Sequence, residues 1–250
     1  MEKKIAAVIM AAGKGKRMNN PDKSKVMFEL KGKPLIEYVV GLTEKINSDL
    51  IIPIVGHQKK SVIDYLDVRF SGLSGKIFYA NQDEQLGTGH AIMQTRELLK
   101  EFDGDVLILS GDVPLLTEDT VRSFLKFHKE NNYNASLISA VLDDPTGYGR
   151  VLRNEDDEFY DIREHKDCSE EELKCSEINS GIYIVESKIL FEAIDTLSTD
   201  NAQGEYYLTD IFEYFTSKGM KIGAFKIGNI TEITGVNSAE QLSELEKKIY

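Results

Sequence analysis

The sequence predicts an α/β fold in which helices cover both faces of a doubly wound, mostly parallel sheet. Along the first 145 residues, apolar runs of strand length alternate with stripes of helical spacing. This alternation favours a parallel sheet, because the chain returns through a helix before each new strand. In addition, 41% of the 250 residues are hydrophobic, which is enough for a sizeable core.

The elements of this first part follow from two periodicities. An uninterrupted apolar run indicates a strand buried on both faces, whereas apolar residues three or four apart indicate a helix. The predicted strands lie at 5–10, 50–55, 76–80, 106–109 and 135–142, and the helical stripes at 35–46, 62–66, 91–99 and 121–128. Pro34 suits the first turn of the first helix. Three cations between Gly13 and Arg17 follow the first apolar run, so we predict a buried strand there and not a signal peptide.

Beyond residue 145 the alternation loosens. Gly147-Tyr148-Gly149 interrupts the chain, and short runs at 150–153 and 159–163 predict a β-rich insertion. The pattern then predicts a strand, a helix, a strand and a last helix, at 182–185, 208–217, 222–227 and from 238 onward. Ser238 and Gln241 resemble a capping box for that helix, and its apolar face is Leu242, Leu245 and Ile249.

Charge excludes some classes of partner. The 30 Lys and Arg residues against 42 Asp and Glu residues leave a net charge of −12. A protein that coats nucleic acid or an anionic membrane needs a broad basic face instead. Residues 1–34 nevertheless hold nine basic and three acidic residues, and such an island suggests a small polyanionic ligand. No uncharged apolar run approaches the ~18 residues of a membrane span. We expect no nucleic acid, no membrane and no protein partner.

Two cysteines, Cys168 and Cys175, are too few for a disulfide framework, and we expect a cytoplasmic protein. If the segment between them is helical, they lie about 10 Å apart along the axis. That exceeds the ~7 Å between Cα atoms that a disulfide spans. A zinc site with His165 as a third ligand matches no standard spacing, so it is a disfavoured alternative.

The turns after the first and fourth strands are the predicted site, because ligands of open parallel sheets bind beyond the carboxyl ends of the strands. In the first turn, A-A-G-K-G-K-R-M at 11–18, small residues allow backbone N–H groups to approach a phosphate, and cations neutralise it. Alone, this motif is equally compatible with a tight turn and solvated lysines. It lacks the third glycine of a dinucleotide fingerprint and the spacing of a P-loop.

Two further loops contain a candidate metal ligand and candidate groups for hydrogen bonding to a nucleotide base. Asp112, at the end of the fourth strand, is placed to hold Mg²⁺, although it also suits a turn before Pro114. Its position beside the first turn favours the metal. The glycine loop from Gln82 to His90 can read a base edge through its amides, and Thr88 can cap the next helix at the same time. His90 is expected to pack or cap, not to catalyse.

Together these loops resemble the uridylyltransferase domain of the bifunctional N-acetylglucosamine-1-phosphate uridylyltransferase/glucosamine-1-phosphate acetyltransferase family. No single motif is specific, but their order over nearly the whole chain is. The matching stretches are A-A-G-K-G-x-R-M, S-K-V at 24–26, Q-D-E-Q-L-G-T-G-H-A at 82–91, G-D-V-P-L at 111–115, D-D-P-T-G-Y-G-R at 143–150, E-H-K-D at 164–167, E-I-N-S-G at 177–181, N-A-Q-G-E-Y-Y-L-T-D at 201–210 and G-V-N-S at 235–238.

The resemblance implies a Rossmann-like sheet with a small β-rich sugar-binding insertion, the nucleotide-diphospho-sugar transferase fold. It implies one nucleotidyltransferase domain over 1–250, with a nucleotide-binding part (1–145), a sugar-binding part (146–237) and a C-terminal helix (238–250). It further implies transfer of a uridylyl group from UTP to N-acetylglucosamine 1-phosphate with Mg²⁺. The hexapeptide repeats of a left-handed β-helix are absent from the sequence, so we expect no acetyltransferase activity.

Residue roles also follow from the resemblance. Nucleotide binding is implied for Met10, Ala11, Ala12, Gly13, Gln82, Gly87, Thr88, Ser110 and Gly111. Arg17 and Lys25 would bind the triphosphate, Asp112 and Asn237 would hold Mg²⁺, and Gly149, Glu164, Asn179 and Thr209 would bind the sugar. The sequence departs from the family at Lys16, usually Thr, at Ser24, usually Pro, and at Ser110, usually an aromatic or similar residue.

Such a reaction brings two highly charged anions together, so catalysis is mainly positioning and charge neutralisation. The attacking phosphate oxygen is already a nucleophile, which agrees with a sequence of four histidines and no evident catalytic triad. Three alternatives remain. They are a cytidylyltransferase, which shares the first motif, a uridylyltransferase for glucose or N-acetylgalactosamine 1-phosphate, and a non-catalytic nucleotide-sugar sensor.

Overall fold

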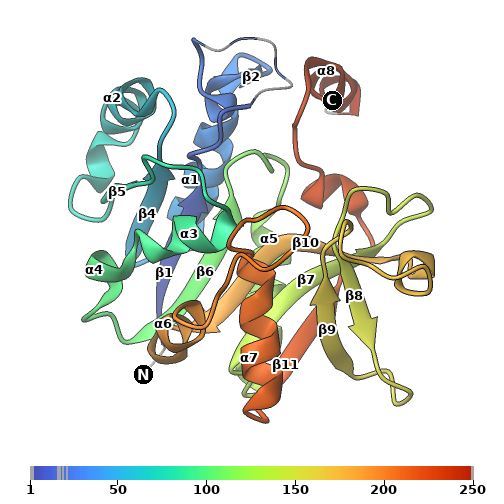
Figure 1. The fold of residues 1–250 in the computed structure, drawn as a ribbon. Helices are drawn as coiled ribbons and strands as arrows, with labels where there is room; N and C mark the ends of the chain where they lie inside the picture. Colours follow the sequence, from blue (N-terminus) through green and yellow to red (C-terminus); the bar gives the residue numbers. More distant parts are fainter. Residues whose placement is uncertain (1–2, 16–17, 19, 21, 249–250) are drawn as a thin grey trace.

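A computed structural model describes residues 3–15, 18, 20 and 22–248, and these form a central sheet in the order β11-β7-β10-β6-β1-β4-β5. Neighbouring strands are parallel except at β10, which is antiparallel to both β6 and β7 (Figure 1). The strands are β1 (Lys4–Met10), β4 (Leu50–Val55), β5 (Ala80–Asn81), β6 (Gly104–Ser110), β7 (Ala135–Val141), β10 (Glu177–Glu186) and β11 (Ile222–Lys226). The predicted fold class, a mostly parallel α/β sheet, is confirmed.

Helices cover both faces of this sheet. On one face the core contains side chains of α1 (Leu35–Lys45), α2 (Lys59–Arg69) and α5 (Glu118–Glu130). On the other it contains those of α3 (Thr88–Met93), α4 (Arg96–Leu99), α6 (Ser187–Ile194) and α7 (Ile211–Ser217). Within β1, Ala6 and Val8 face the second layer and Ile9 faces the first, because side chains alternate along a strand. Both faces are therefore apolar, which explains the uninterrupted apolar runs of the sequence.

The β-rich insertion is an antiparallel pair, β8 (Arg150–Arg153) and β9 (Phe159–Arg163), which joins the main sheet through β10. Figure 1 shows this hairpin at one side of the molecule, next to α7. A second small hairpin, β2 (Glu29–Leu30) with β3 (Lys33–Pro34), follows the first turn and precedes α1. The division of the chain at residues 145 and 237 stays a prediction.

Several element predictions need correction. The strand predicted at 76–80 is wrong: β5 is only Ala80–Asn81, and Ile77 makes an isolated bridge to Ile51. The stripe at 91–99 is divided between α3 and α4, because the Thr95 N–H and hydroxyl both bond to the carbonyl of Ile92 and tighten the turn. Pro34 precedes α1 and does not stand within its first turn. Helix α6 and the hairpin of β2 and β3 were not predicted.

The final helix, α8 (Ala239–Lys248), is capped nearly as predicted. The Ser238 hydroxyl accepts a hydrogen bond from the Gln241 N–H at 3.3 Å, while the Gln241 side chain accepts from the Asn237 N–H at 2.7 Å, one residue earlier than a capping box requires. Leu245 is buried and Leu242 packs beside it; Ile249 lies outside the described residues. Within the described part of the chain, none of the helices is both long and apolar enough to cross a membrane.

The disfavoured zinc site is not formed. Cys168 donates to the carbonyl of Arg163 and Cys175 to those of Val151 and Glu177, and both are free thiols. Among the residues that the structure describes, no three His, Cys, Asp or Glu side chains are grouped so that they could hold a metal ion.

Candidate active site

The turns after β1 and β6 meet at one edge of the sheet. Met10 and Ser110, the last residues of these strands, are paired in register, and the Gly111 N–H donates to the Met10 carbonyl at 3.0 Å. A Cβ at position 111 would lie 3.1 Å from that carbonyl oxygen, so the two turns approach closely because residue 111 is glycine. The prediction that both turns form one site agrees with this arrangement.

A cavity of about 290 Å³ opens at this edge. Its lining contains all the predicted nucleotide residues except Gly111, together with Lys25 and Asp112; the full lining is Met10, Ala11, Ala12, Gly13, Lys25, Val26, Gln82, Gln85, Gly87, Thr88, Ala91, Ser110, Asp112 and Glu205. Gln85 and Glu205 were not singled out from the sequence. Both lie inside motif stretches that carry the family resemblance, and that was the available signal.

One wall of the cavity is made by two loops held together through their backbones. The Gly89 N–H donates to the Tyr206 carbonyl, and the Tyr206 N–H donates to the Leu86 carbonyl, both at 2.8 Å. The Thr88 hydroxyl accepts from the Leu208 N–H at 3.0 Å, so it does not cap α3, whose N-cap is Gly87. The alternative that Thr88 is a plain N-cap is therefore wrong.

Gln82 and His90 form the polar part of the same wall. The buried Gln82 amide donates to the Gly87 carbonyl at 3.0 Å and lies 3.2 Å from Nδ1 of His90. The other ring nitrogen of His90 lies 3.2 Å from the Gln94 amide. The amide nitrogens of two glutamines thus flank the His90 ring, and its packing role stays a prediction.

Lys25 and Asp112 line the cavity, and Asn237 meets them there through Lys25. The Lys25 ammonium contacts the Asp112 carboxylate and donates to Oδ1 of Asn237 at 2.7 Å. The Val236 N–H donates to the Asp112 carbonyl at 2.9 Å, which fixes the Asn237 segment beside the end of β6. A carboxylate and an amide oxygen thus share one cation. Because these are also ligand atoms that Mg²⁺ accepts, the pair fits a magnesium site once the ammonium moves away.

The backbone conformation of Ser24 influences the direction of the neighbouring Lys25 side chain. Ser24 has φ −60° and ψ 140°, the conformation that the usual proline would hold, and its buried hydroxyl has no hydrogen-bond partner among the described residues. Ser24 therefore holds a backbone conformation that proline can also adopt. Arg17 and Lys16 lie outside the described residues, so their predicted roles stay predictions.

The predicted sugar residues form a second cluster, on one rung of the β8–β9–β10 strands. Arg150 pairs with Arg163 and with Ile178, so the neighbouring residues Gly149, Glu164 and Asn179 come together. The Asn179 N–H donates to the Gly149 carbonyl at 2.9 Å, and the Thr209 hydroxyl donates to Glu164 at 3.1 Å. The β8–β9 hairpin and β10 thus bring Gly149, Glu164 and Asn179 together, and Thr209 joins them through its hydrogen bond to Glu164.

Ser110 connects the two clusters. A Cβ on Gly181 would lie 3.7 Å from the Ser110 hydroxyl, where β10 is irregular between Asn179 and Tyr183. Gly181 has φ +76°, which favours glycine. A small residue at position 110 therefore faces the strand that carries Asn179.

Acidic groups lie close together beside the sugar residues. Burial raises the pKa of Glu164 above its ordinary value, although the Thr209 hydroxyl opposes the shift. Burial also raises the pKa of Asp210 to about 6, and the charges of Glu213 and Glu164 add to this shift. At neutral pH, the ionised carboxylate of Asp210 is therefore less stable in the folded protein than in the unfolded chain.

Asp210→Asn is expected to stabilise the protein near pH 7.5 by about 1 kcal/mol, a value reduced for the partial exposure of the group. The folded pKa lies above that of the unfolded chain, so the wild type loses stability as the pH rises from about 4 through 6. The advantage of the variant should appear over that interval and vanish near pH 4. Urea unfolding against pH measures it, with the exposed Asp200→Asn as control. An equal advantage at both ends of the range would contradict the argument.

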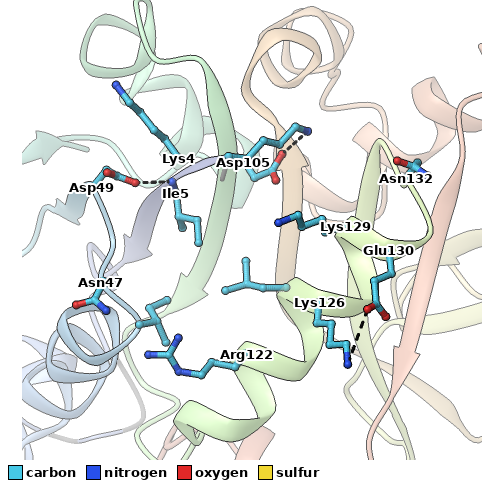
Figure 2. A pocket seen from close by; sticks show the side chains of 13 residues that line it. Lys4, Ile5, Asn47, Asp49, Asp105, Arg122, Lys126, Lys129, Glu130 and Asn132 are labelled. Atoms are coloured by element: carbon cyan, nitrogen blue, oxygen red, sulfur yellow. Dashed lines mark hydrogen bonds and ion pairs between the residues drawn. The ribbon is translucent and has the colours of Figure 1, made fainter. Parts of the chain in front are cut away.

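A second, larger cavity of about 770 Å³ lies at the opposite edge, where β1 and β6 begin (Figure 2). Figure 2 shows Arg122, Lys126 and Lys129 of α5 along one side of it. Lys3 pairs with Asp105 at 2.9 Å and Lys126 approaches Glu130 at 3.8 Å. The described residues that line this cavity include none of the predicted site residues, so size alone does not identify the site.

The sheet order, the glycine turn after β1 and the carboxylate after β6 agree with an α/β enzyme that binds a nucleotide. Residues 6–230 match the family described as nucleotidyl transferase, and the chain belongs to this family.

Curated relatives agree with the family. The bifunctional protein GlmU of Acetivibrio thermocellus is 44% identical over 240 residues, which are 96% of this chain and 50% of that protein. GlmU of Clostridium botulinum (strain Loch Maree) is 43% identical over the same share of this chain and 51% of its own length. The chain thus spans about half the length of these relatives. The family resemblance drawn from the motifs is confirmed.

Solved structures support the fold. A UDP-glucose pyrophosphorylase complexed with UDP-glucose superposes with a TM-score of 0.79 at 20% identity, covering 100% of this chain and 99% of that one. A putative glucose-1-phosphate thymidylyltransferase from Bacillus anthracis gives 0.77 at 20% identity, covering 98% and 94%. At this identity the likeness concerns the fold alone.

Proposed function

We propose that the chain transfers a uridylyl group from UTP to N-acetylglucosamine 1-phosphate and releases pyrophosphate, with Mg²⁺ bound by Asp112 and Asn237, in the cytoplasm. The observation that carries the proposal is the convergence of Lys25, Asp112 and Asn237 on the cavity that the glycine turn and the Gln82–Thr88 loop line. The 44% identity to a GlmU protein supports it, as do the motifs of the sugar cluster.

The reaction needs no activated side chain. A phosphate oxygen of the sugar phosphate attacks the α-phosphorus of UTP, a new P–O bond forms, and the bond to the bridging oxygen breaks. Pyrophosphate leaves with the electron pair of that bond. Bound Mg²⁺ would neutralise phosphate charge. The chain orients the two substrates on adjacent clusters, and Lys25 supplies a cation to the triphosphate.

The geometry implies that the Lys25 ammonium and a divalent cation compete for the same two oxygens. Lys25→Met is therefore expected to tighten Mn²⁺ or Mg²⁺ binding without nucleotide by about tenfold, as removal of a close competing charge can. Calorimetric titration of the nucleotide-free protein measures this affinity, and Lys25→Arg, which keeps a cation there, is the matched control. An unchanged affinity in Lys25→Met would argue against a metal site at Asp112 and Asn237.

Pyrophosphate release with UTP, Mg²⁺ and a panel of sugar 1-phosphates tests the proposed reaction. The expected result is preference for N-acetylglucosamine 1-phosphate over glucose and N-acetylgalactosamine 1-phosphates, because one hydroxyl or acetamido contact decides among them. Preference for another sugar would keep the uridylyltransferase and correct the substrate. Preference for CTP would overturn the uridine assignment, and no turnover with any pair would favour the nucleotide-sugar sensor.

A further inference from the structure

We propose that Arg150 is the positioning residue of the sugar cluster: its buried guanidinium ties the loop before β8 to the turn after β9 and so places Gly149 and Glu164. This inference rests on the proposed function, since it assigns a sugar 1-phosphate or nucleotide sugar to that cluster. Arg150 itself is not placed against the substrate.

Arg150 is buried in an unusual way. Its side chain is 1% exposed, and among the described residues no carboxylate lies within ion-pair distance of it. Its Nε also has no hydrogen-bond partner there. A buried charge is normally paired with an opposite charge, because its desolvation is otherwise unfavourable. The partners that Arg150 does have therefore show what its guanidinium holds.

Those partners belong to two different loops. Nη1 donates to the Pro145 carbonyl at 2.7 Å and also to the Tyr148 carbonyl. Nη2 lies 3.4 Å from Nδ1 of His165. Gly149 directly follows Tyr148, and Glu164 directly precedes His165. One rigid, planar fork of donors thus bridges the segments that carry two predicted sugar residues.

Strand register places Arg150 one position along the strands from the predicted sugar residues. It pairs with Arg163 and Ile178, so Gly149, Glu164 and Asn179 occupy the next positions beyond it. Successive side chains of a strand point to opposite faces, so the side chain of Arg150 lies on the face opposite to those of Glu164 and Asn179. A Cβ on Gly149 would make ordinary contact with the Glu164 carboxylate at 3.5 Å, so the two segments that Arg150 joins lie directly beside each other.

The test is calorimetric binding of UDP and of UDP-N-acetylglucosamine to the wild type, Arg150→Met and Arg150→Lys. Both variants are expected to bind UDP as the wild type does and the nucleotide sugar about tenfold more weakly, because misplaced binding groups lose orientation. The KM for the sugar 1-phosphate should rise by a similar factor while the KM for UTP stays within about twofold. Lysine keeps the charge but not the planar fork, so it should not restore sugar binding.

Arg153→Met is the matched control, on the same strand. Arg153 pairs with Glu177 at 2.8 Å, and this variant should lower thermal stability without a selective effect on the sugar ligand. Retained UDP binding shows that an Arg150 variant is folded. Equal loss for both ligands, no loss for either, or full recovery in Arg150→Lys would overturn the positioning role. Failure of the wild type to turn over any sugar 1-phosphate would instead count against the proposed function.

Discussion

Asp112→Asn is expected to lower the rate of pyrophosphate release at least about 100-fold, the loss seen when a key electrostatic group is removed. The Asp112 carboxylate stands at the end of β6, against the Lys25 ammonium and beside Asn237. An amide keeps the shape of the side chain but removes the charge that holds a cation there. The steady-state rate at saturating UTP and Mg²⁺ measures this loss.

The matched control is Asp119→Asn, an exposed aspartate in the first turn of α5. It makes the same change of charge at an exposed position and should leave the rate within about twofold of the wild type, as surface substitutions do. A near-normal rate in Asp112→Asn would remove the basis of the metal assignment. Equal losses in both variants would show that the effect is one of net charge.

Gly87→Ala is expected to destabilise the protein by about 2–4 kcal/mol and to weaken UTP binding, because two penalties add. Gly87 has φ +115°, which residues with a Cβ rarely adopt. A Cβ there would also lie 2.5 Å from the carbonyl oxygen of Tyr206 and 2.8 Å from its nitrogen. The contact between the two loops that form one wall of the nucleotide cavity must therefore open. Urea unfolding and UTP titration measure the two effects.

Gly219→Ala separates the two penalties. Gly219 also has a positive φ, +65°, but a Cβ at this position meets nothing within 4 Å among the described residues. The control therefore carries only the backbone strain, which is about 1 kcal/mol, and should bind UTP normally. If Gly87→Ala loses no more stability than Gly219→Ala, the close approach of the two loops is not what requires glycine at position 87.

Some strands of this chain could be predicted from local sequence to the residue, and others could not. Runs such as 50–55 and 150–153 became strands with the predicted bounds, because an apolar run or a β-rich run between turn residues has few alternatives. The run at 76–80 did not become a strand of that length, because the length of an edge strand depends on how many residues of the neighbouring strand are available for pairing. Helix α6 is an element that was not predicted although a pattern for it exists. Its buried Leu190, Ala193 and Ile194 follow helical spacing, but the stripe is short.

The parts of the candidate site that lie in local motifs were predicted, whereas the parts that depend on long-range contacts were not. Local motifs indicated the turns after β1 and β6 and the Gln82 loop, and these lie on one cavity. Glu205 lines the same cavity only because its loop is bonded to residues 86–89, a contact that spans more than a hundred residues. The ammonium of Lys25 was expected at the triphosphate, and the structure places it between Asp112 and Asn237.

By itself, the sequence determined the α/β class and the nucleotidyltransferase family and indicated the turns that line one cavity beyond the strand ends, because periodicity and ordered motifs are local properties of the chain. Only the tertiary structure decided that Gly149, Glu164 and Asn179 share one rung, that β10 runs antiparallel between β6 and β7, and that Arg150 is buried with no carboxylate partner among the described residues. These features depend on strand order, register and burial. Periodicity and motifs do not encode them, since they arise only when the paired strands and the loops around them come together.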